Sequence, residues 1–176
     1  KGRRSLRQYF PAITICPYNK IKCSYLQRDL ENCYLTNCSN LWNIASWDCF
    51  LVVHYMRMEL YGQLQQTDRQ RIGMEREVMV KLCTINHSPC SGYFDAQTIN
   101  TVSRGNCFGF NYNGSFQVRA GPEEGMSLEF FLARNESVWH SMNNKVGLRV
   151  VLHQPNEVPL IEELGRDVFP GSSHEF

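Results

Sequence analysis

The seven residues from Gly105 to Asn111, Gly-Asn-Cys-Phe-Gly-Phe-Asn, set a single cysteine inside a short aromatic run. Phe108 and Phe110 alternate along this run, which predicts a strand with one buried face. No second cysteine lies within the run, so Cys107 needs a bonding partner from elsewhere in the chain. The strand is therefore expected to lie beside a segment that is distant in the sequence.

The chain of 176 residues contains eight cysteines, an even number. Three glycosylation sequons accompany them, at Asn37, Asn113 and Asn135. A fourth, at Asn86, is followed by Pro89 and is expected to be a poor acceptor. Together, the cysteines and the sequons favour an oxidising, extracellular setting.

The composition is that of a folded domain, with 43% hydrophobic residues, 20% charged residues and a net charge of +1. The balanced charge argues against a nucleic-acid partner, because proteins that bind nucleic acids carry a concentrated basic face. The sequence has no run of 18 apolar residues, and its basic start at Lys1 leads into no signal peptide. We therefore expect the sequence to be an excerpt of a longer, membrane-anchored protein.

Three further segments carry strand patterns. Phe10–Cys16 is mainly apolar, with Pro11 near its start, and it ends in a second lone cysteine. Ser127–Leu132 alternates between polar and apolar residues, and Gly147–His153 does so again. Phe169–Gly171 resembles the lead-in to another strand. These patterns predict an α+β chain whose strands form a mixed sheet.

Helical periodicity begins near Ser46 and runs to Tyr61, and Gly62 stands where a C-cap glycine is expected. Thr67 and Gln70 have the spacing of a capping box, which predicts the start of a second helix. The expected inward residues of this second helix are Met74, Val78 and Leu82. Apolar stripes of this kind are more often core packing than a ligand groove, so we expect packing here.

Four cysteines lie at irregular spacings in the polar and aromatic stretch around these helices: Cys23, Cys33, Cys38 and Cys49. Zinc sites need tight pairs of cysteine or histidine, which this stretch lacks. Disulfides within a helical, loop-rich insert are expected instead, and the sequence does not choose among the three possible pairings.

Two short loops follow the helical region. Cys83 and Cys90 bracket six residues, a loop that a disulfide closes easily. His87 inside that loop has no identifiable companion ligand, so we expect a solvated side chain rather than a metal site or proton sensor. Asn113-Gly114 is typical of a hairpin turn.

Four segments in fixed order resemble the degenerin/epithelial sodium channel superfamily, which includes the acid-sensing channels. Phe10–Cys16 resembles its Phe-Pro-Ala-Val-Thr-hydrophobic-Cys strand, and Gly105–Asn111 resembles its Gly-x-Cys-aromatic-Thr-Phe-Asn strand. Gly147–Pro159 resembles its Gly-Leu-x-Val-x-x-His segment with the following Glu-x-Pro loop, and Phe169–Gly171 its next Pro-Gly turn. The order and spacing of these motifs make the match specific.

The resemblance implies the N-terminal part of the extracellular domain of a trimeric channel. Residues 1–20 would be the juxtamembrane lead-in and first palm strand, residues 21–104 the β-ball and a disulfide-stapled finger, and residues 105–176 palm and β-ball strands. The thumb and both transmembrane helices would be absent from this chain. The resemblance also implies two disulfides, Cys16–Cys107 and Cys83–Cys90.

Two positions depart from the family pattern. Gly109 stands where the family usually has threonine. Acid-sensing members carry an Asp-Glu doublet in a carboxylate-rich pocket, and here the doublet is Asn135-Glu136. Close carboxylates raise one another's pKa, so the loss of one weakens proton sensing near neutral pH. We therefore expect gating by protons through Glu136 to be absent or weak.

The resemblance thus predicts part of an amiloride-sensitive type of sodium channel on the extracellular side of the plasma membrane. The stimulus would be a peptide, protons or force. The partners would be other channel subunits and an extracellular peptide or matrix ligand. No cofactor is expected, and sodium would be the ion that the full-length channel conducts. The alternative is a soluble, disulfide-rich binding module without a pore. An enzyme is not expected, because the chain has neither a Gly-x-Ser-x-Gly nor a His-Glu-x-x-His motif.

Overall fold

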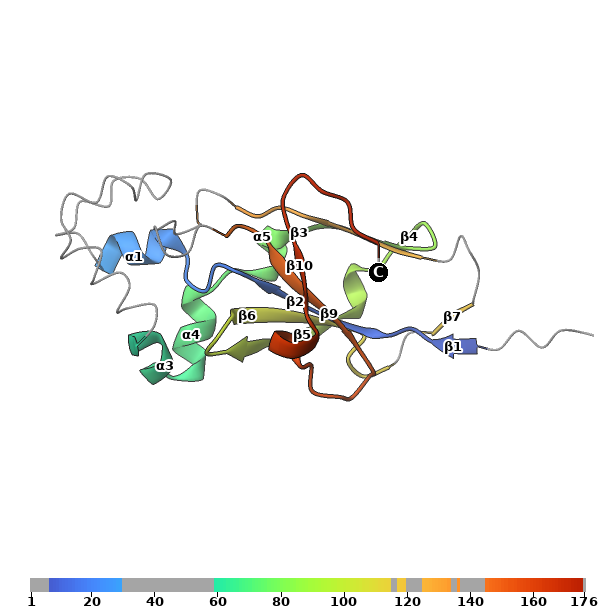
Figure 1. Cartoon of the computed structure of the whole chain (residues 1–176), viewed down its shortest axis with the longest axis horizontal. Coiled ribbons are helices and arrows are strands. Elements are labelled where there is room, and N and C mark those ends of the chain that lie inside the picture. The colour runs from blue at the N-terminus through green and yellow to red at the C-terminus, as the bar shows by residue number, and fades with distance from the viewer. Residues whose placement is uncertain are drawn as a thin grey trace, which may run out of the picture.

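The computed structural model describes residues 7–29, 59–114, 117–119, 125–133, 136 and 145–175. These residues form an α+β fold with a five-stranded sheet, a three-stranded sheet and a separate two-stranded ladder (Figure 1). Most of the helix expected between residues 46 and 61 lies outside the described residues. The α+β class is confirmed.

The five-stranded sheet is antiparallel at every pairing, so the expectation of a mixed sheet is wrong. A tight turn at residues 102–104 joins two of its strands as a hairpin, and the chain returns in the opposite direction at each other pairing. In spatial order the strands are β10 (Arg166–Val168), β9 (Leu148–His153), β2 (Ala12–Pro17), β6 (Gly105–Phe110) and β5 (Phe94–Thr101).

Strands β2 and β6 are buried along their whole length. The expectation that β6 has only one buried face is therefore wrong. One face packs Ile13, Ile15, Phe108 and Phe110 into the main core, while the opposite face is covered near the Cys107 position by other apolar groups. Both faces are buried because the main core covers one of them and the cluster of Cys16, Cys107, Val151 and Ile161 covers the other.

The three-stranded sheet has the order β4 (Ser88–Pro89), β3 (Val80–Ile85) and β8 (Met126–Phe130). Strand β8 alternates between half-buried and exposed residues, as its sequence predicts, but ends two residues before Leu132. Strands β3 and β4 form a hairpin whose two turn residues, Asn86 and His87, have φ of 50° and 62°. Positive φ at both positions is what a type I′ hairpin turn requires.

A two-stranded ladder pairs β1 (Arg7–Tyr9) with β7 (Gln117–Arg119). Strand β6 has its hydrogen-bonded neighbours in β2 and β5, and not in β7. The turn at Asn113-Gly114 therefore does not close a hairpin, and that expectation is wrong. The turn instead carries the chain from one sheet to a different ladder.

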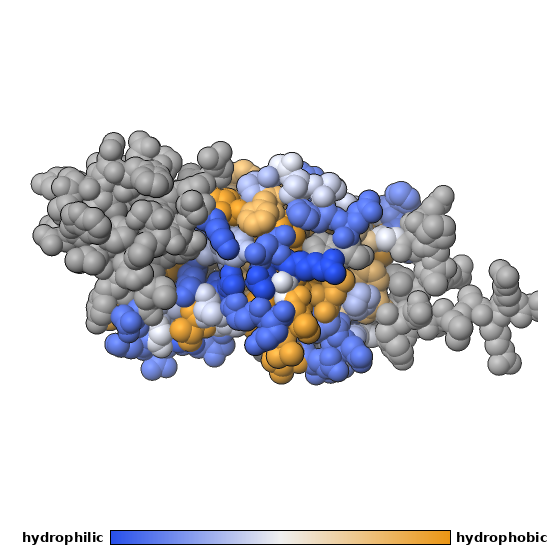
Figure 2. Space-filling model, in the orientation of Figure 1, coloured by the Kyte–Doolittle hydropathy of each residue, from blue (hydrophilic) through white to orange (hydrophobic). Residues whose placement is uncertain are grey.

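The main core lies between the five-stranded and three-stranded sheets. Phe110 is fully buried, and three aromatic rings surround it in edge-on contacts with centroids 5.4 to 6.4 Å away: Phe10, Tyr93 and Phe94. Edge-to-face contacts add to the area that these rings bury. The surface in this view is hydrophilic near its centre and has several separate apolar areas below and above it (Figure 2).

The described helices are short: α1 (Cys23–Asp29), α3 (Tyr61–Gln63), α4 (Gln66–Ile72), α5 (Arg76–Met79), α6 (Ile161–Leu164) and the 3₁₀ turn η4 (Ser91–Tyr93). Gly62 lies inside α3 rather than at its C-cap. Helix α4 begins after Gln65 with no side-chain cap, so Thr67 does not form a capping box. The helix expected to reach Leu82 ends at Ile72, and Leu82 belongs to a strand.

The helix ends there because a buried side chain occupies the space beside Gly73. Asn106 on β6 donates from its amide nitrogen to the carbonyls of Gln70 and Met74, at 2.8 and 2.9 Å. Its oxygen accepts a hydrogen bond from Asn100 at 2.9 Å. A Cβ at position 73 would lie 2.6 Å from the Asn106 amide nitrogen. The break in the helix thus lets β6 bind one carbonyl in the last turn of α4 and one carbonyl just beyond it.

We expect Gly73→Ala to lower the free energy of unfolding by about 1–3 kcal/mol, because Asn106 is held by three hydrogen bonds and cannot move aside. Chemical denaturation checks this value. Gly92→Ala is the matched control, since a Cβ there meets nothing within 4 Å, and its effect should stay within about 0.5 kcal/mol. Equal effects of the two substitutions would contradict the role given to Asn106.

Candidate functional site

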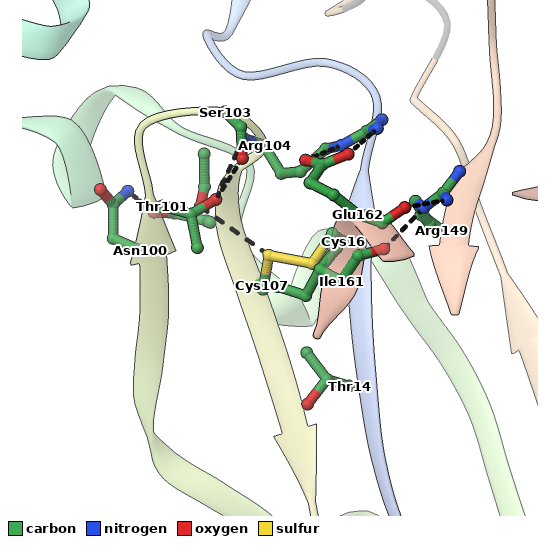
Figure 3. The surroundings of a disulfide bond; sticks show 12 residues. Thr14, Cys16, Asn100, Thr101, Ser103, Arg104, Cys107, Arg149, Ile161 and Glu162 are labelled. Carbon is green, nitrogen blue, oxygen red and sulfur yellow. Dashed lines mark hydrogen bonds and ion pairs between the residues drawn. A yellow bond between two sulfur atoms is a disulfide. The ribbon is translucent and has the colours of Figure 1, made fainter. Parts of the chain in front are cut away.

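The Cys16–Cys107 disulfide links the neighbouring strands β2 and β6 across 91 residues of sequence (Figure 3). Both cysteines are fully buried. This is the pairing that the family resemblance implies. Closing so long a loop stabilises the fold by about 4–5 kcal/mol in the chain-entropy picture.

Helix α6 covers this disulfide. Its Ile161 packs with Cys16, Cys107 and Val151 in a small apolar cluster on the side of the sheet away from the main core. A single helical turn does not hold its place by its own hydrogen bonds, because forming one turn is unfavourable in isolation. The side chains around α6 must therefore hold it against the sheet.

Arg149 on β9 supplies the first anchor. Its Nε and Nη2 donate to the carbonyls of Ile161 and Glu162, at 2.7 and 2.8 Å. Its Nη1 donates to the carboxylate of Asp167 on β10 at 2.6 Å. One guanidinium group thus binds the helix backbone and the edge strand at the same time, using the fork of donors that arginine provides.

Arg104, in the turn between β5 and β6, supplies the second anchor. Its Nε and Nη2 donate to the two oxygens of the Glu162 carboxylate, at 2.8 and 2.5 Å (Figure 3). The hydroxyl of Thr101 accepts the Arg104 backbone N–H at 3.0 Å and holds the turn in shape. This bidentate geometry is the strong form of a charged hydrogen bond. Two arginines from distant segments therefore hold α6 in place.

These charges shift the titration of their partners. The hydrogen bond from Arg104 lowers the pKa of Glu162 to about 2. The pKa of Asp167 is also lowered, first by Tyr18 and then by Arg149. Burial, with the nearby Asp167 carboxylate, raises the pKa of Tyr18 to about 12. Glu162 and Asp167 therefore stay ionised, and Tyr18 stays neutral, through the physiological range. We call Arg104 and Arg149 with these two carboxylates the α6 clamp, which does not sense protons in that range.

Gly109, where the family usually has threonine, lies against another carboxylate. A Cβ at this position would lie 2.5 Å from Oδ2 of Asp95 on β5. The same oxygen accepts the backbone N–H of Tyr112 at 3.3 Å, and burial raises the pKa of Asp95. The glycine therefore leaves room for a half-buried acidic group that no sequence motif indicated.

Glu136 has a partner in the structure. Its Oε2 accepts the backbone N–H of Ser24 in the first turn of α1 at 2.9 Å, and its own carbonyl accepts the Asn19 side chain at 2.7 Å. No group of three or more histidine, cysteine, aspartate or glutamate side chains in the described residues is arranged to hold a metal ion. The structure thus joins Glu136 to a helix start.

The remaining expected site residues lie apart from this clamp. Cys83–Cys90 closes the β3–β4 hairpin, whose tip exposes His87. Asn113 is exposed in its turn, so its glycosylation stays a prediction. Cys23 is disulfide-bonded. The calls that lie outside the described residues are Cys33, Cys38, Cys49, Asn37 and Asn135.

Sequence reasoning missed an apolar cleft of about 450 Å³ between the two sheets. Its walls are mainly apolar side chains from β2, β8, β9 and β10, and His174 and Glu175 also line it. The alternation of β8 was the one signal in the sequence, because it places Met126, Leu128 and Phe130 on the same face. The Arg104 and Arg149 anchors had no such signal.

The low pKa of Glu162 makes stability depend on pH. Because the folded pKa is below the ordinary value of 4.5, the Arg104–Glu162 pair contributes fully above about pH 4.5 and is lost as pH falls toward 2. Glu162→Gln should therefore flatten the fall in unfolding free energy over this range, measured by urea denaturation. Glu163→Gln is the control, and an equal flattening by it would contradict the assignment.

Comparison with known proteins gives one family. The family model described as amiloride-sensitive sodium channel matches residues 4–176. An FMRFamide-activated amiloride-sensitive sodium channel of Cornu aspersum is 28% identical over an alignment covering 96% of this chain and 29% of the relative. Acid-sensing ion channel 4-B of Danio rerio is 30% identical, with 92% and 29% covered. The epithelial sodium channel subunit beta of Oryctolagus cuniculus is 26% identical, with 64% and 18% covered.

The chain spans about three tenths of the length of the first two relatives. Within the described ranges, no helix is long and apolar enough to cross a membrane. The family model nevertheless covers nearly the whole sequence. The chain belongs to the amiloride-sensitive sodium channel family.

Proposed function

We propose that this chain is an extracellular portion of a trimeric sodium channel and that it passes an external stimulus toward the pore of the full-length protein. The observation that carries the proposal is the family match over residues 4–176. Residues 1–20 are proposed as the juxtamembrane lead-in and first palm strand, residues 21–104 as β-ball and finger, and residues 105–176 as palm and β-ball.

The arrangement of the sheet supports a transmitting role. Strand β2 follows the lead-in and lies in the centre of the five-stranded sheet, between β6 and β9. The Cys16–Cys107 bond fastens it to β6, and Arg149 and Arg104 fasten α6 to β9 and to the β5–β6 turn. A displacement of the chain segment that precedes β6 would therefore be passed on to β2, because the disulfide joins the two strands.

A peptide is the stimulus that we favour over protons. The Glu136 carboxylate already accepts a hydrogen bond from Ser24, and its neighbour Asn135 cannot share a proton with it. The cleft between the sheets has the volume and the apolar walls of a ligand site. A relative named as FMRFamide-activated makes a peptide stimulus a reasonable class for this protein as well.

The test is to record currents from oocytes that express the full-length protein, under candidate peptides, acid and amiloride. We expect an amiloride-blocked sodium current that a peptide evokes. Cys16→Ser with Cys107→Ser should reduce the current at equal surface expression, because β2 would no longer be fastened to β6. The alternative, a soluble binding module without a pore, predicts peptide binding with no current in any condition.

Acid should evoke little or no current through the Glu136 region, because Asn135 stands where acid-sensing members of the family carry a second carboxylate. The measurement is a pH step from 7.4 to 5 on the full-length channel, compared with the Glu136→Gln variant. A large acid-evoked current that Glu136→Gln abolishes would refute this expectation. Glu157→Gln is a control for the loss of an exposed carboxylate elsewhere.

A further inference from the structure

Strand β8 forms an edge of the three-stranded sheet. In the part of the chain that the structure describes, β8 pairs with β3 on one side and with no strand on the other. The strand contains no proline, and Glu129 is its only charged residue. Unpaired backbone groups along such an edge are a place where another extended chain can add.

The register of the sheet shows which backbone groups of β8 face the free edge. The carbonyl of Gly125 accepts the Asn86 N–H at 3.2 Å, so the backbone of Gly125 faces β3. Backbone groups alternate in direction along an antiparallel strand, so every second residue after Gly125 also faces β3. The N–H and C=O groups of Met126 and Leu128 therefore point to the free edge.

The side chains of the same two residues, Met126 and Leu128, line the apolar cleft between the sheets. Leu152 of β9 also lines this cleft, and it is 41% exposed. Val150, on the same face of β9, is only 7% exposed and packs in the main core. Apolar surface thus stays uncovered between β8 and β9, and every second side chain of a strand added to β8 would cover it.

The acidic groups at this edge have no partner of opposite charge. Glu129 is exposed on the face of β8 that is turned away from the cleft, and Glu175 lines the cleft itself. Neither carboxylate forms an ion pair with a described residue. A basic side chain beside Glu129 on an added strand would form a cross-strand ion pair.

The basic groups near the edge are already engaged. The Lys81 ammonium group lies 5.4 Å from the centre of the Phe131 ring, on the β3 side of β8. His174, which lines the cleft, shares a hydrogen bond of 2.8 Å with Ser172. Arg166 of β10 has an interaction of its own. The charge left unpaired at this edge is therefore negative, which favours a basic partner.

We propose that a linear peptide adds to β8 as a fourth, antiparallel strand of the small sheet. Its apolar side chains, at alternate positions, enter the cleft, and a basic side chain between them pairs with Glu129. Hydrogen bonds to the main chain of Met126 and Leu128 hold the peptide, and the cleft selects its alternate side chains. The proposal rests on the proposed function in taking a peptide to be the external stimulus.

Photolabelling of the full-length protein on the oocyte surface tests the site. The probe is acetyl-Leu-Lys-Bpa-Ser-Leu-amide, in which Bpa is the photoreactive residue benzoylphenylalanine. In the antiparallel register its lysine lies opposite Glu129 and its Bpa opposite Leu128. We expect irradiation to join Bpa to Val150, Leu152 or Val168 on the other walls of the cleft, as mass spectrometry of the digested protein will show.

The matched control probe carries leucine at the third position and Bpa at the fourth. Its photoreactive side chain is turned away from the cleft, so it should label none of the three valine and leucine residues. Equal labelling by both probes would overturn the proposal. Absence of labelling in the cleft, with surface expression intact, would also overturn it, because another part of the full-length chain or a second copy would then cover the edge.

Methylation of the probe's backbone distinguishes an added strand from other modes of binding in the cleft. In the antiparallel register the N–H of the third residue donates to the Leu128 carbonyl, whereas the N–H of the second residue points to solvent. N-methylation of the third residue should weaken labelling about tenfold, and N-methylation of the second by less than about twofold. Equal losses, or a larger loss at the second residue, would overturn the antiparallel register.

Charge exchange tests the ion pair at Glu129. Glu129→Lys should reduce labelling by the lysine probe up to about fivefold, and a probe with glutamate in place of lysine should restore it. Glu157→Lys, a charge change at an exposed carboxylate outside β8 and the cleft, should leave labelling unchanged. Failure of the glutamate probe to restore labelling would overturn the assigned pairing.

Currents recorded from the same oocytes distinguish this proposal from the proposed function. Labelling of the cleft without any peptide-evoked current supports the added strand and rejects a peptide as the stimulus. A peptide-evoked current with labelling only outside the cleft overturns the added strand and leaves the channel function standing.

Discussion

Strands β2 and β6 are far apart in the sequence and lie side by side in the middle of the large sheet. They are paired in an antiparallel ladder, and the Cys16–Cys107 bond crosslinks them across 91 residues. Every other strand of the large sheet adds to this pair, since β9 lies against β2 and β5 lies against β6. The main core also starts here, because Ile13, Ile15 and Phe108 come from the two strands. A fold built on this pair needs both ends of the intervening chain to meet before the sheet can form.

Polar side chains hold the short elements that bury little apolar area. Asn106 binds one carbonyl in the last turn of α4 and one just after it, and Arg104 and Arg149 hold a single helical turn over the disulfide. Each of these side chains is at least partly shielded from water, where a hydrogen bond is stronger and a lost partner is costly. The short elements of this protein are therefore positioned by specific contacts between distant residues. Their intrinsic helix or strand preference contributes less.

For the channel subunit proposed above, this construction suits a part that moves as one body. Glu162, with a pKa of about 2, stays ionised through the physiological range, and Tyr18, with a pKa of about 12, stays neutral. Small changes of pH near neutrality would leave the clamp unaltered. The apolar cleft proposed for a peptide is lined by strands of the same two sheets. A peptide bound there would act on both sheets at once.

The sequence by itself determined the family, the α+β class and the approximate positions of β2, β6, β8 and β9, because motifs and alternating apolar residues are local signals. Predictions from these local patterns were wrong where a residue distant in the sequence determines the local structure. The stripe through Met74 and Val78 predicted one helix to Leu82, but Asn106 ends that helix at Gly73. The clamp on α6 could not be predicted from the sequence for the same reason, since no spacing rule joins Arg104 to Glu162 across 58 residues. Only the tertiary structure decided these features, because they arise from side chains that meet after the sheet has formed.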